Sequence, residues 1–178
     1  MIHFETTIPV RYYEADPMGI VHHSNYIRYF ECARDEMISS WGYGIEKCQA
    51  DGIVFPVAGI QVKYHASARI GDVLRVTADI ESLPMAKLVV KQAVYNQNGV
   101  LCADGVVTLG FMNGNTGRIM GCPEQFRKLM EKYDKGYPST ILPSVSEVGS
   151  SFPASISISA SPTRSDSLAK MARARVRL

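Results

Sequence analysis

The clearest pattern in the chain is a helical one near its N-terminal end. Apolar side chains recur there at spacings of three and four residues, at Tyr26, Phe30, Ala33, Met37 and Trp41. This spacing places them on one face of an α-helix. Ser24 or Asn25 is the expected N-cap, and Gly42 can close the far end. Ile27, Tyr29 and Ile38 widen the apolar face, so the rest of the chain should largely enclose this helix.

Alternation of apolar and polar residues predicts strands on both sides of this helix. The expected strands span residues 3–13, 60–67, 74–81, 86–95 and 100–112. In the second of these, Tyr64 alternates with polar residues and is expected on the buried face. Gly71-Asp72 and Asn98-Gly99 are turn signals, so the later strands should be antiparallel neighbours. A last helix is expected from Pro123, with Phe126, Leu129, Met130 and Tyr133 on its apolar side.

This order of elements predicts an α+β fold, in which an antiparallel sheet of about five strands curls round one long central helix. Open sheet edges favour pairing between chains, so at least a homodimer is expected. On the helix, Glu31 and Arg34 are three residues apart and are expected to form an ion pair that reaches the interface.

Composition divides the chain after residue 137. Residues 138–178 contain 11 Ser and few large apolar residues, so they are expected to be a disordered tail. Within this tail, residues 167–178 could form a short basic helix, although a solvated tail is the simpler interpretation. The net charge of +2 also arises there, because residues 1–137 carry 14 Lys and Arg against 15 Asp and Glu. The folded domain therefore gives no indication of nucleic-acid binding.

Other compositional signals exclude several classes of protein. The four cysteines form no CxxC or Cys/His pattern, so reduced thiols in a cytoplasmic protein are expected. No segment approaches about 18 consecutive apolar residues, and residues 1–13 have no secretory pattern, so neither a membrane span nor export is expected. His22 and His23 are adjacent on a loop and seldom would both reach one ion, so no metal site is expected.

Candidate chemistry lies between the first strand and the long helix. Asp16 precedes the first turn of this helix, whose N–H groups are unpaired and lie at the positive end of the helix dipole. Such a carboxylate can attack a carbonyl or activate water, while the amides stabilise the developing negative charge. Gly19 permits a tight turn, and Pro17 stiffens the approach. On spacing alone, a turn role for Asp16 is the simpler interpretation.

A family resemblance changes that balance. The run from Asp16 to His22 reads Asp-Pro-Met-Gly-Ile-Val-His, and it is followed by Asn25-Tyr26, Phe30-Glu31 and Ala33-Arg34. This run closely resembles the active-site signature of the 4-hydroxybenzoyl-CoA thioesterase and YbgC-like branch of hotdog-fold acyl-CoA thioesterases. Residues 62–74 also resemble the second strand and turn of that family, and the whole resemblance spans about residues 5–132.

The resemblance implies hydrolysis of an acyl-CoA thioester, with coenzyme A as part of the substrate and no separate cofactor. It implies that Asp16 is the catalytic carboxylate, as nucleophile or general base, and that the backbone N–H of His23 polarises the carbonyl. His22 is a candidate orienting or proton-carrying group, with a surface or packed imidazole as the alternative. The resemblance also implies active sites shared between subunits of a dimer, usually paired into a homotetramer.

The candidate substrate contacts are Gly19, Ile20, Val21, Asn25, Tyr26, Arg69 and Lys87. Asn25 and Tyr26 are also explained by the helix start and by packing. Arg69 and Lys87 are the cations suggested for the CoA phosphates, although residues 84–87 lack the basic cluster associated with the 4-hydroxybenzoyl enzyme. The alternative function is a non-catalytic hotdog module that binds acyl-CoA or acyl carrier protein, with a hydratase as a lesser variant. Asp16 together with Gly19 favours turnover, because a binding module has no need of a carboxylate beside an acyl carbonyl.

Overall fold

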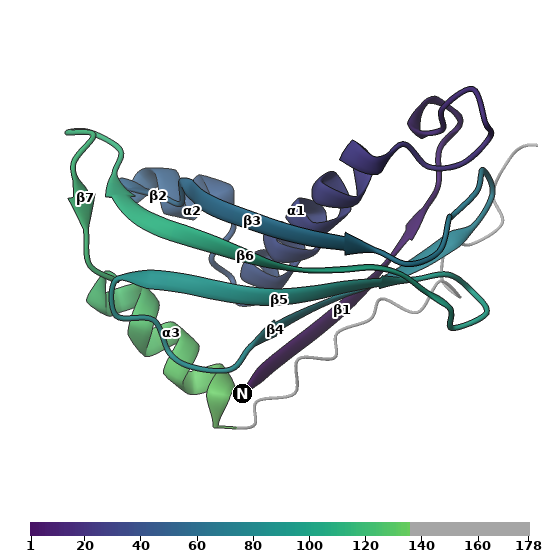
Figure 1. Cartoon of the computed structure of the whole chain (residues 1–178). Helices are drawn as coiled ribbons and strands as arrows, with labels where there is room; N and C mark the ends of the chain where they lie inside the picture. The colour runs from purple at the N-terminus through teal and green to yellow at the C-terminus, as the bar shows by residue number, and fades with distance from the viewer. Residues whose placement is uncertain (136–178) are drawn as a thin grey trace, which may run out of the picture. The chain divides into compact units, whose positions relative to one another are not determined.

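The computed structural model describes residues 1–135 of the chain, so the tail predicted at 138–178 lies outside the described residues. Its centre is a helix, α1 (His23–Ser40), lying across a curved antiparallel sheet (Figure 1). The long strands run in the order β1 (Ile2–Pro9), β4 (Val73–Ile80), β5 (Lys87–Tyr95), β6 (Leu101–Asn113) and β3 (Val57–Tyr64). Every neighbouring pair is antiparallel. The predicted α+β architecture is therefore confirmed.

Several short elements were not predicted. A 3-10 turn, η1 (Tyr12–Glu14), ends the segment expected to continue the first strand. After α1 come a short helix, α2 (Ile45–Ala50), and a two-residue strand, β2 (Ile53–Val54). A second two-residue strand, β7 (Ile119–Met120), also pairs with the end of β6. The final helix, α3 (Glu124–Asp134), begins after Pro123, close to the predicted start.

The inner face of α1 is enclosed by the sheet because its apolar side chains meet the alternating apolar residues of the strands. Phe30, Ala33 and Met37 are fully buried against the core. On the sheet, β5 shows strict alternation, with Leu88, Val90 and Val94 buried. Each of these large side chains contributes about 1.5–3 kcal/mol by leaving water.

The Phe30 side chain of α1 lies close to the backbone of the sheet at Gly105 in β6. A Cβ atom at this position would lie 2.5 Å from the carbonyl oxygen of Gln61 and 3.0 Å from the Phe30 ring. Such distances are shorter than van der Waals contact, so only glycine lets the Phe30 side chain rest on the sheet here.

Two local predictions about α1 are wrong. The N-cap is His22 rather than Ser24 or Asn25, and its ring nitrogen accepts the N–H of Ser24 at 3.4 Å. Arg34 does not pair with Glu31. It is only 5% exposed, and its Nη1 donates to Oε1 of Gln92 at 2.8 Å, while Gln92 Nε2 donates to the carbonyl of Phe30 at 2.8 Å. A buried guanidinium requires an acceptor inside the core, which the exposed Glu31 side chain does not supply.

An aromatic cluster closes the end of the core beneath α3. Phe126 is fully buried and packs against the rings of Phe55 at 5.1 Å and Tyr43 at 5.7 Å. These contacts confirm the predicted apolar side of the last helix. Within the described residues, no helix is long and apolar enough to cross a membrane.

The close approach at Gly105 predicts the effect of two glycine substitutions. Gly105→Ala should lower the free energy of unfolding by about 1–3 kcal/mol, because the added methyl must displace backbone or Phe30. Gly110→Ala is the matched control on the same strand, since its Cβ would meet Pro56 at an ordinary 3.6 Å. Urea unfolding of both variants measures the difference, and equal stabilities would show that the helix can move away from the sheet without loss.

Candidate functional site

A short loop between η1 and α1 carries the predicted catalytic carboxylate. Ala15 and Val21 form an isolated antiparallel bridge that closes residues 15–21 into a hairpin-like loop. Inside it, the N–H of Asp16 donates to the carbonyl of Ile20 at 2.9 Å, and the N–H of Gly19 donates to the carbonyl of Asp16 at 2.9 Å. Gly19 has φ of +73°, which an L side chain rarely adopts, so its predicted role in a tight turn is confirmed.

The Asp16 carboxylate is held by one of its two oxygens. Oδ1 accepts the N–H of Met18 at 2.8 Å, as in an Asx turn. No hydrogen bond to Oδ2 is present within residues 1–135. The side chain is half-buried and lies at the edge of a cavity, so the second oxygen is available to a ligand or to water.

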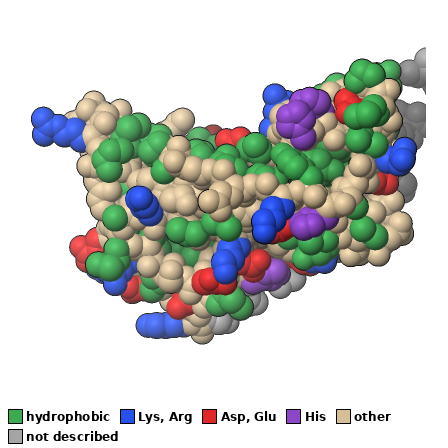
Figure 2. Space-filling model, in the orientation of Figure 1, with side chains coloured by type: hydrophobic (Ala, Val, Ile, Leu, Met, Phe, Trp, Pro, Cys, Tyr) green, Lys and Arg blue, Asp and Glu red, His purple; other side chains and the backbone are tan. Residues whose placement is uncertain are grey.

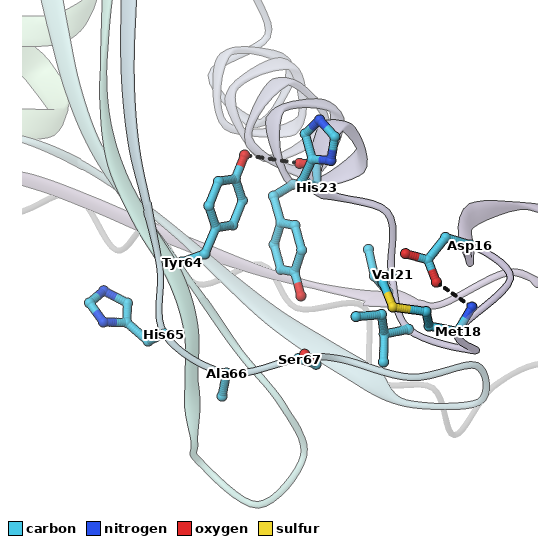
Figure 3. Close-up of a pocket in the computed structure, with 10 residues that line it drawn as sticks. Asp16, Met18, Val21, His23, Tyr64, His65, Ala66 and Ser67 are labelled. Atoms are coloured by element: carbon cyan, nitrogen blue, oxygen red, sulfur yellow. Dashed lines mark hydrogen bonds between the residues drawn. The ribbon is translucent and has the colours of Figure 1, made fainter.

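This cavity has a volume of about 340 Å³ and is bounded by three parts of the chain (Figure 3). The loop contributes Asp16, Met18, Ile20 and Val21. The start of α1 contributes His23 and Tyr26, and the end of β3 with the segment that follows it contributes residues 64–67. Asp16 lies on one side of the cavity, with Tyr64 and His23 across from it (Figure 3).

The first residue of α1, His23, lines the same cavity. The helix begins at His23, and the N–H of this residue has no acceptor in the described part of the chain. Helices leave their first N–H groups unpaired, and the dipole makes this end positive. The His22 side chain does not line the cavity. Its Nδ1 lies 2.8 Å from Oγ of Ser24, so the ring interacts with the first turn of the helix instead.

Two tyrosines form an aromatic wall between the helix and the sheet edge. The Tyr64 hydroxyl donates to the carbonyl of His23 at 3.1 Å, and the N–H of Ala68 donates to the Tyr26 hydroxyl at 3.1 Å. Their rings meet edge to face at 5.5 Å. Burial raises the pKa of Tyr26, so this phenol stays neutral at physiological pH.

Only some of the predicted site residues line this cavity. Asp16, Ile20, Val21, His23 and Tyr26 line the cavity. Asn25 does not line the cavity, and its buried Nδ2 donates to the carbonyl of Glu14 at 2.7 Å. Arg69 is exposed beside the loop, to which it is joined by a bridge with Ile20.

Lys87 lies at the other end of the sheet. It is paired with Gly110, whereas Tyr64 at the cavity is paired with Ala103, seven residues away along β6. This separation is roughly 23 Å at the usual rise of a strand. Lys87 therefore does not line this cavity.

Sequence reasoning did not place Tyr64 and His65 at the candidate site. Tyr64 was expected on the buried face, yet it is 49% exposed and forms a wall of the cavity. His65 also lines the cavity and is paired with Asp104 of β6. The sequence signals for this side of the site were the aromatic residue in an alternating strand and the resemblance of residues 62–74 to the family. No group of three or more His, Cys, Asp or Glu residues in the described chain is arranged to hold a metal.

The fold is that of hotdog-fold thioesterases. The crystal structure of the DHNA-CoA thioesterase from Staphylococcus aureus matches with a TM-score of 0.69 and 30% identity, over 76% of this chain and 91% of that one. Residues 10–130 match the family model of the thioesterase-like superfamily. The chain therefore belongs to this superfamily, and the predicted fold and family are confirmed.

Curated relatives agree with this assignment. The chain is 30% identical over 104 residues to the acyl-CoA thioester hydrolase YbgC of Escherichia coli O6:H1, over 58% of this chain and 78% of the relative. It is 28% identical over 129 residues to the acyl-CoA thioesterase YbgC of Helicobacter pylori, over 68% of this chain and 95% of the relative. The prediction of a thioester hydrolase is thus confirmed at the level of the family.

The capping geometry predicts the behaviour of His22 variants. His22→Ala should destabilise the protein by about 0.5–2 kcal/mol, because the helix start loses its side-chain acceptor. His22→Asn should keep the stability, since Asn is a favoured N-cap, and should also keep the rate of thioester hydrolysis. Thermal unfolding and a thiol-release assay measure the two properties. A loss of more than about tenfold in rate for a stable His22→Asn protein would instead support the proton-carrying role.

Proposed function

We propose that this chain hydrolyses an acyl-CoA thioester to a free acid and coenzyme A in the cavity beside Asp16. The observation that carries this proposal is that Asp16 lines the same cavity as His23, the first residue of α1, whose N–H has no acceptor within the described residues. A carboxylate and a preorganised N–H donor are the two components that thioester cleavage requires.

In the proposed reaction, the acyl carbonyl lies between Asp16 and the start of α1. The N–H of His23 donates to the carbonyl oxygen as negative charge develops on it. Oδ2 of Asp16 either attacks the carbonyl carbon, giving an anhydride that water then cleaves, or removes a proton from the attacking water. In both routes the C–S bond breaks, the hydroxyl of water joins the acyl carbon, and its proton goes to the CoA sulfur.

The other proposed contacts follow from position. Ile20, Val21 and Tyr26 present apolar surface to the acyl group, while Gly19 keeps the loop backbone close to it. Arg69 is the cation beside the loop that we assign to a CoA phosphate. Lys87 lies far along the sheet from the cavity, so we assign it no contact with the acyl group and leave to it only a contact with the distant CoA phosphates.

We propose that two chains pair along the outer edge of β3, and that such dimers pair into a tetramer. Within the described residues, β6 is the only strand that pairs with β3, so the other edge of β3 is open. Hydrophobic side chains gather along this rim of the molecule (Figure 2), and Val57 and Tyr64 of β3 are both about half exposed. An open, partly apolar edge strand of eight residues favours pairing with another strand. Because Tyr64 also lines the cavity, this pairing would place the site near the subunit boundary.

Asp16→Asn is the direct test of the proposed mechanism. Asn should keep the loop intact, because Asn96 and Asn113 already accept N–H groups two residues ahead, at 3.0 Å each, in other turns of this chain. The amide cannot take a proton from water and is a poor nucleophile. The rate of thioester hydrolysis should therefore fall by at least about a hundredfold, with little change in KM. Asp16→Glu should also be slow, because it moves the carboxylate by about 1 Å.

The assay measures thiol release from a panel of aromatic, short-chain and long-chain acyl-CoAs, with folding checked by circular dichroism. A folded Asp16→Asn protein that retains more than a tenth of the wild-type rate would make Asp16 a turn residue. Binding of acyl-CoA by the wild type without any thiol release would support the non-catalytic alternative.

The oligomeric state is tested by light scattering at micromolar concentration. We expect the mass of a dimer or a tetramer, because the edge of β3 is otherwise left exposed to water. A monomeric mass would contradict the proposed pairing.

A further inference from the structure

Glu14 lies two residues before Asp16, and the proposed reaction gives it no part. We propose that Glu14 is a positioning residue that fixes the Asp16 loop against the first two turns of α1. The inference rests on the proposed function only for its effect on the reaction rate. The claim that Glu14 holds the loop in place rests instead on hydrogen bonds within residues 11–29.

The Glu14 side chain is buried and satisfied by donors from two directions. It is only 6% exposed, and its Oε2 accepts the N–H of Arg11 at 2.7 Å and the hydroxyl of Tyr29 at 2.9 Å. Arg11 Nη1 lies 3.4 Å from Oε1. Burial, and then the bond to Glu14, raise the pKa of Tyr29, so its hydroxyl remains a proton donor. A buried carboxylate is tolerated only with such partners, which makes its position well defined.

The backbone of the same residue holds the other end of the loop. The carbonyl oxygen of Glu14 accepts the N–H of His22 at 2.9 Å and Nδ2 of Asn25 at 2.7 Å. His22 is the N-cap of α1, and Asn25 lies in its first turn. Glu14 therefore joins the chain before Asp16 both to the end of the loop and to the helix whose first residue lines the cavity.

Asp16 has no comparable connection of its own. Its hydrogen bonds go to Met18, Gly19 and Ile20, all within the loop. The loop is otherwise attached through Val21, whose N–H donates to the carbonyl of Ala68 at 2.8 Å, and through the bridge between Ile20 and Arg69. These two attachments join the loop to the segment after β3, whereas Glu14 joins it to α1. The distance between the carboxylate and the His23 N–H therefore depends on Glu14.

The chain offers a matched control at the opposite end of α1. Tyr43 is buried, and its hydroxyl donates to the carboxylate of Asp51, as that of Tyr29 does to Glu14. Burial and the bond to Asp51 also raise the pKa of Tyr43. Neither Tyr43 nor Asp51 lines the cavity beside Asp16. In both pairs a tyrosine hydroxyl donates to a carboxylate. Only the pair of Tyr29 and Glu14 adjoins the loop that carries Asp16.

The experiment compares Tyr29→Phe with Tyr43→Phe in the full chain. Tyr29→Phe should lower kcat by roughly tenfold or more and leave KM within about threefold, because catalysis is more sensitive than binding to a small displacement of the carboxylate. Hydrogen–deuterium exchange of residues 15–22 should become faster in the same variant. Tyr43→Phe should change neither kcat nor exchange in this segment, even if both variants lose similar stability.

Glu14 variants add a graded comparison. Glu14→Gln retains an oxygen that can accept from Tyr29 and should lose less kcat than Glu14→Ala, which removes the acceptor. If Tyr29→Phe matches Tyr43→Phe in both kcat and exchange, Glu14 is only a structural residue and the inference is overturned. If the wild type releases no thiol from any acyl-CoA, the proposed function fails, and the exchange comparison alone then decides whether Glu14 positions the loop.

Discussion

Enclosure of α1 by the sheet is the interaction on which the rest of the structure depends. The helix has 18 residues and is therefore about 27 Å long, and its inner face is buried along that length. This requires a close approach at Gly105, where the Phe30 ring rests on the backbone of β6 and β3. Because the body of the helix is fixed in this way, its first turn is fixed at the end of the sheet, and the cavity forms there.

Polar groups inside this arrangement are satisfied in ways that also define its geometry. In the core, Arg34 donates to Gln92, which in turn donates to the carbonyl of Phe30. At the start of the helix, Glu14 accepts bonds from Tyr29 and Asn25. Buried hydrogen bonds contribute modestly to net stability, but leaving their partners unpaired is expensive. They therefore restrict α1 to one rotation and one axial position relative to the loop that carries Asp16.

Much of the fold could be predicted because it is encoded in local periodicity. The three- and four-residue spacing from Tyr26 to Trp41 located α1, and alternation located the five long strands. The short strands β2 and β7 have two residues each, too few to show a period. The cap at His22 was missed because histidine is not a usual N-cap, and its role depends on a ring nitrogen that reaches Ser24.

The site was predictable only on the side that one continuous motif supplies. Asp16, Gly19 and the start of α1 lie within a few residues of one another in the sequence. Tyr64 and His65 reach the cavity through the register of β3 against β6, which no local pattern reveals. Likewise, the partner of Arg34 lies 58 residues away, so a nearby Glu was the natural but incorrect choice.

The central claim is that a thioester is cleaved between Asp16 and the start of α1. A crystal structure with an acyl-CoA analogue whose sulfur is replaced by a methylene group tests this most directly. We predict that the analogue's carbonyl oxygen lies within about 3.2 Å of the His23 nitrogen, with the Asp16 carboxylate facing the carbonyl carbon. An analogue bound with its carbonyl in another cavity, away from both groups, would contradict the account.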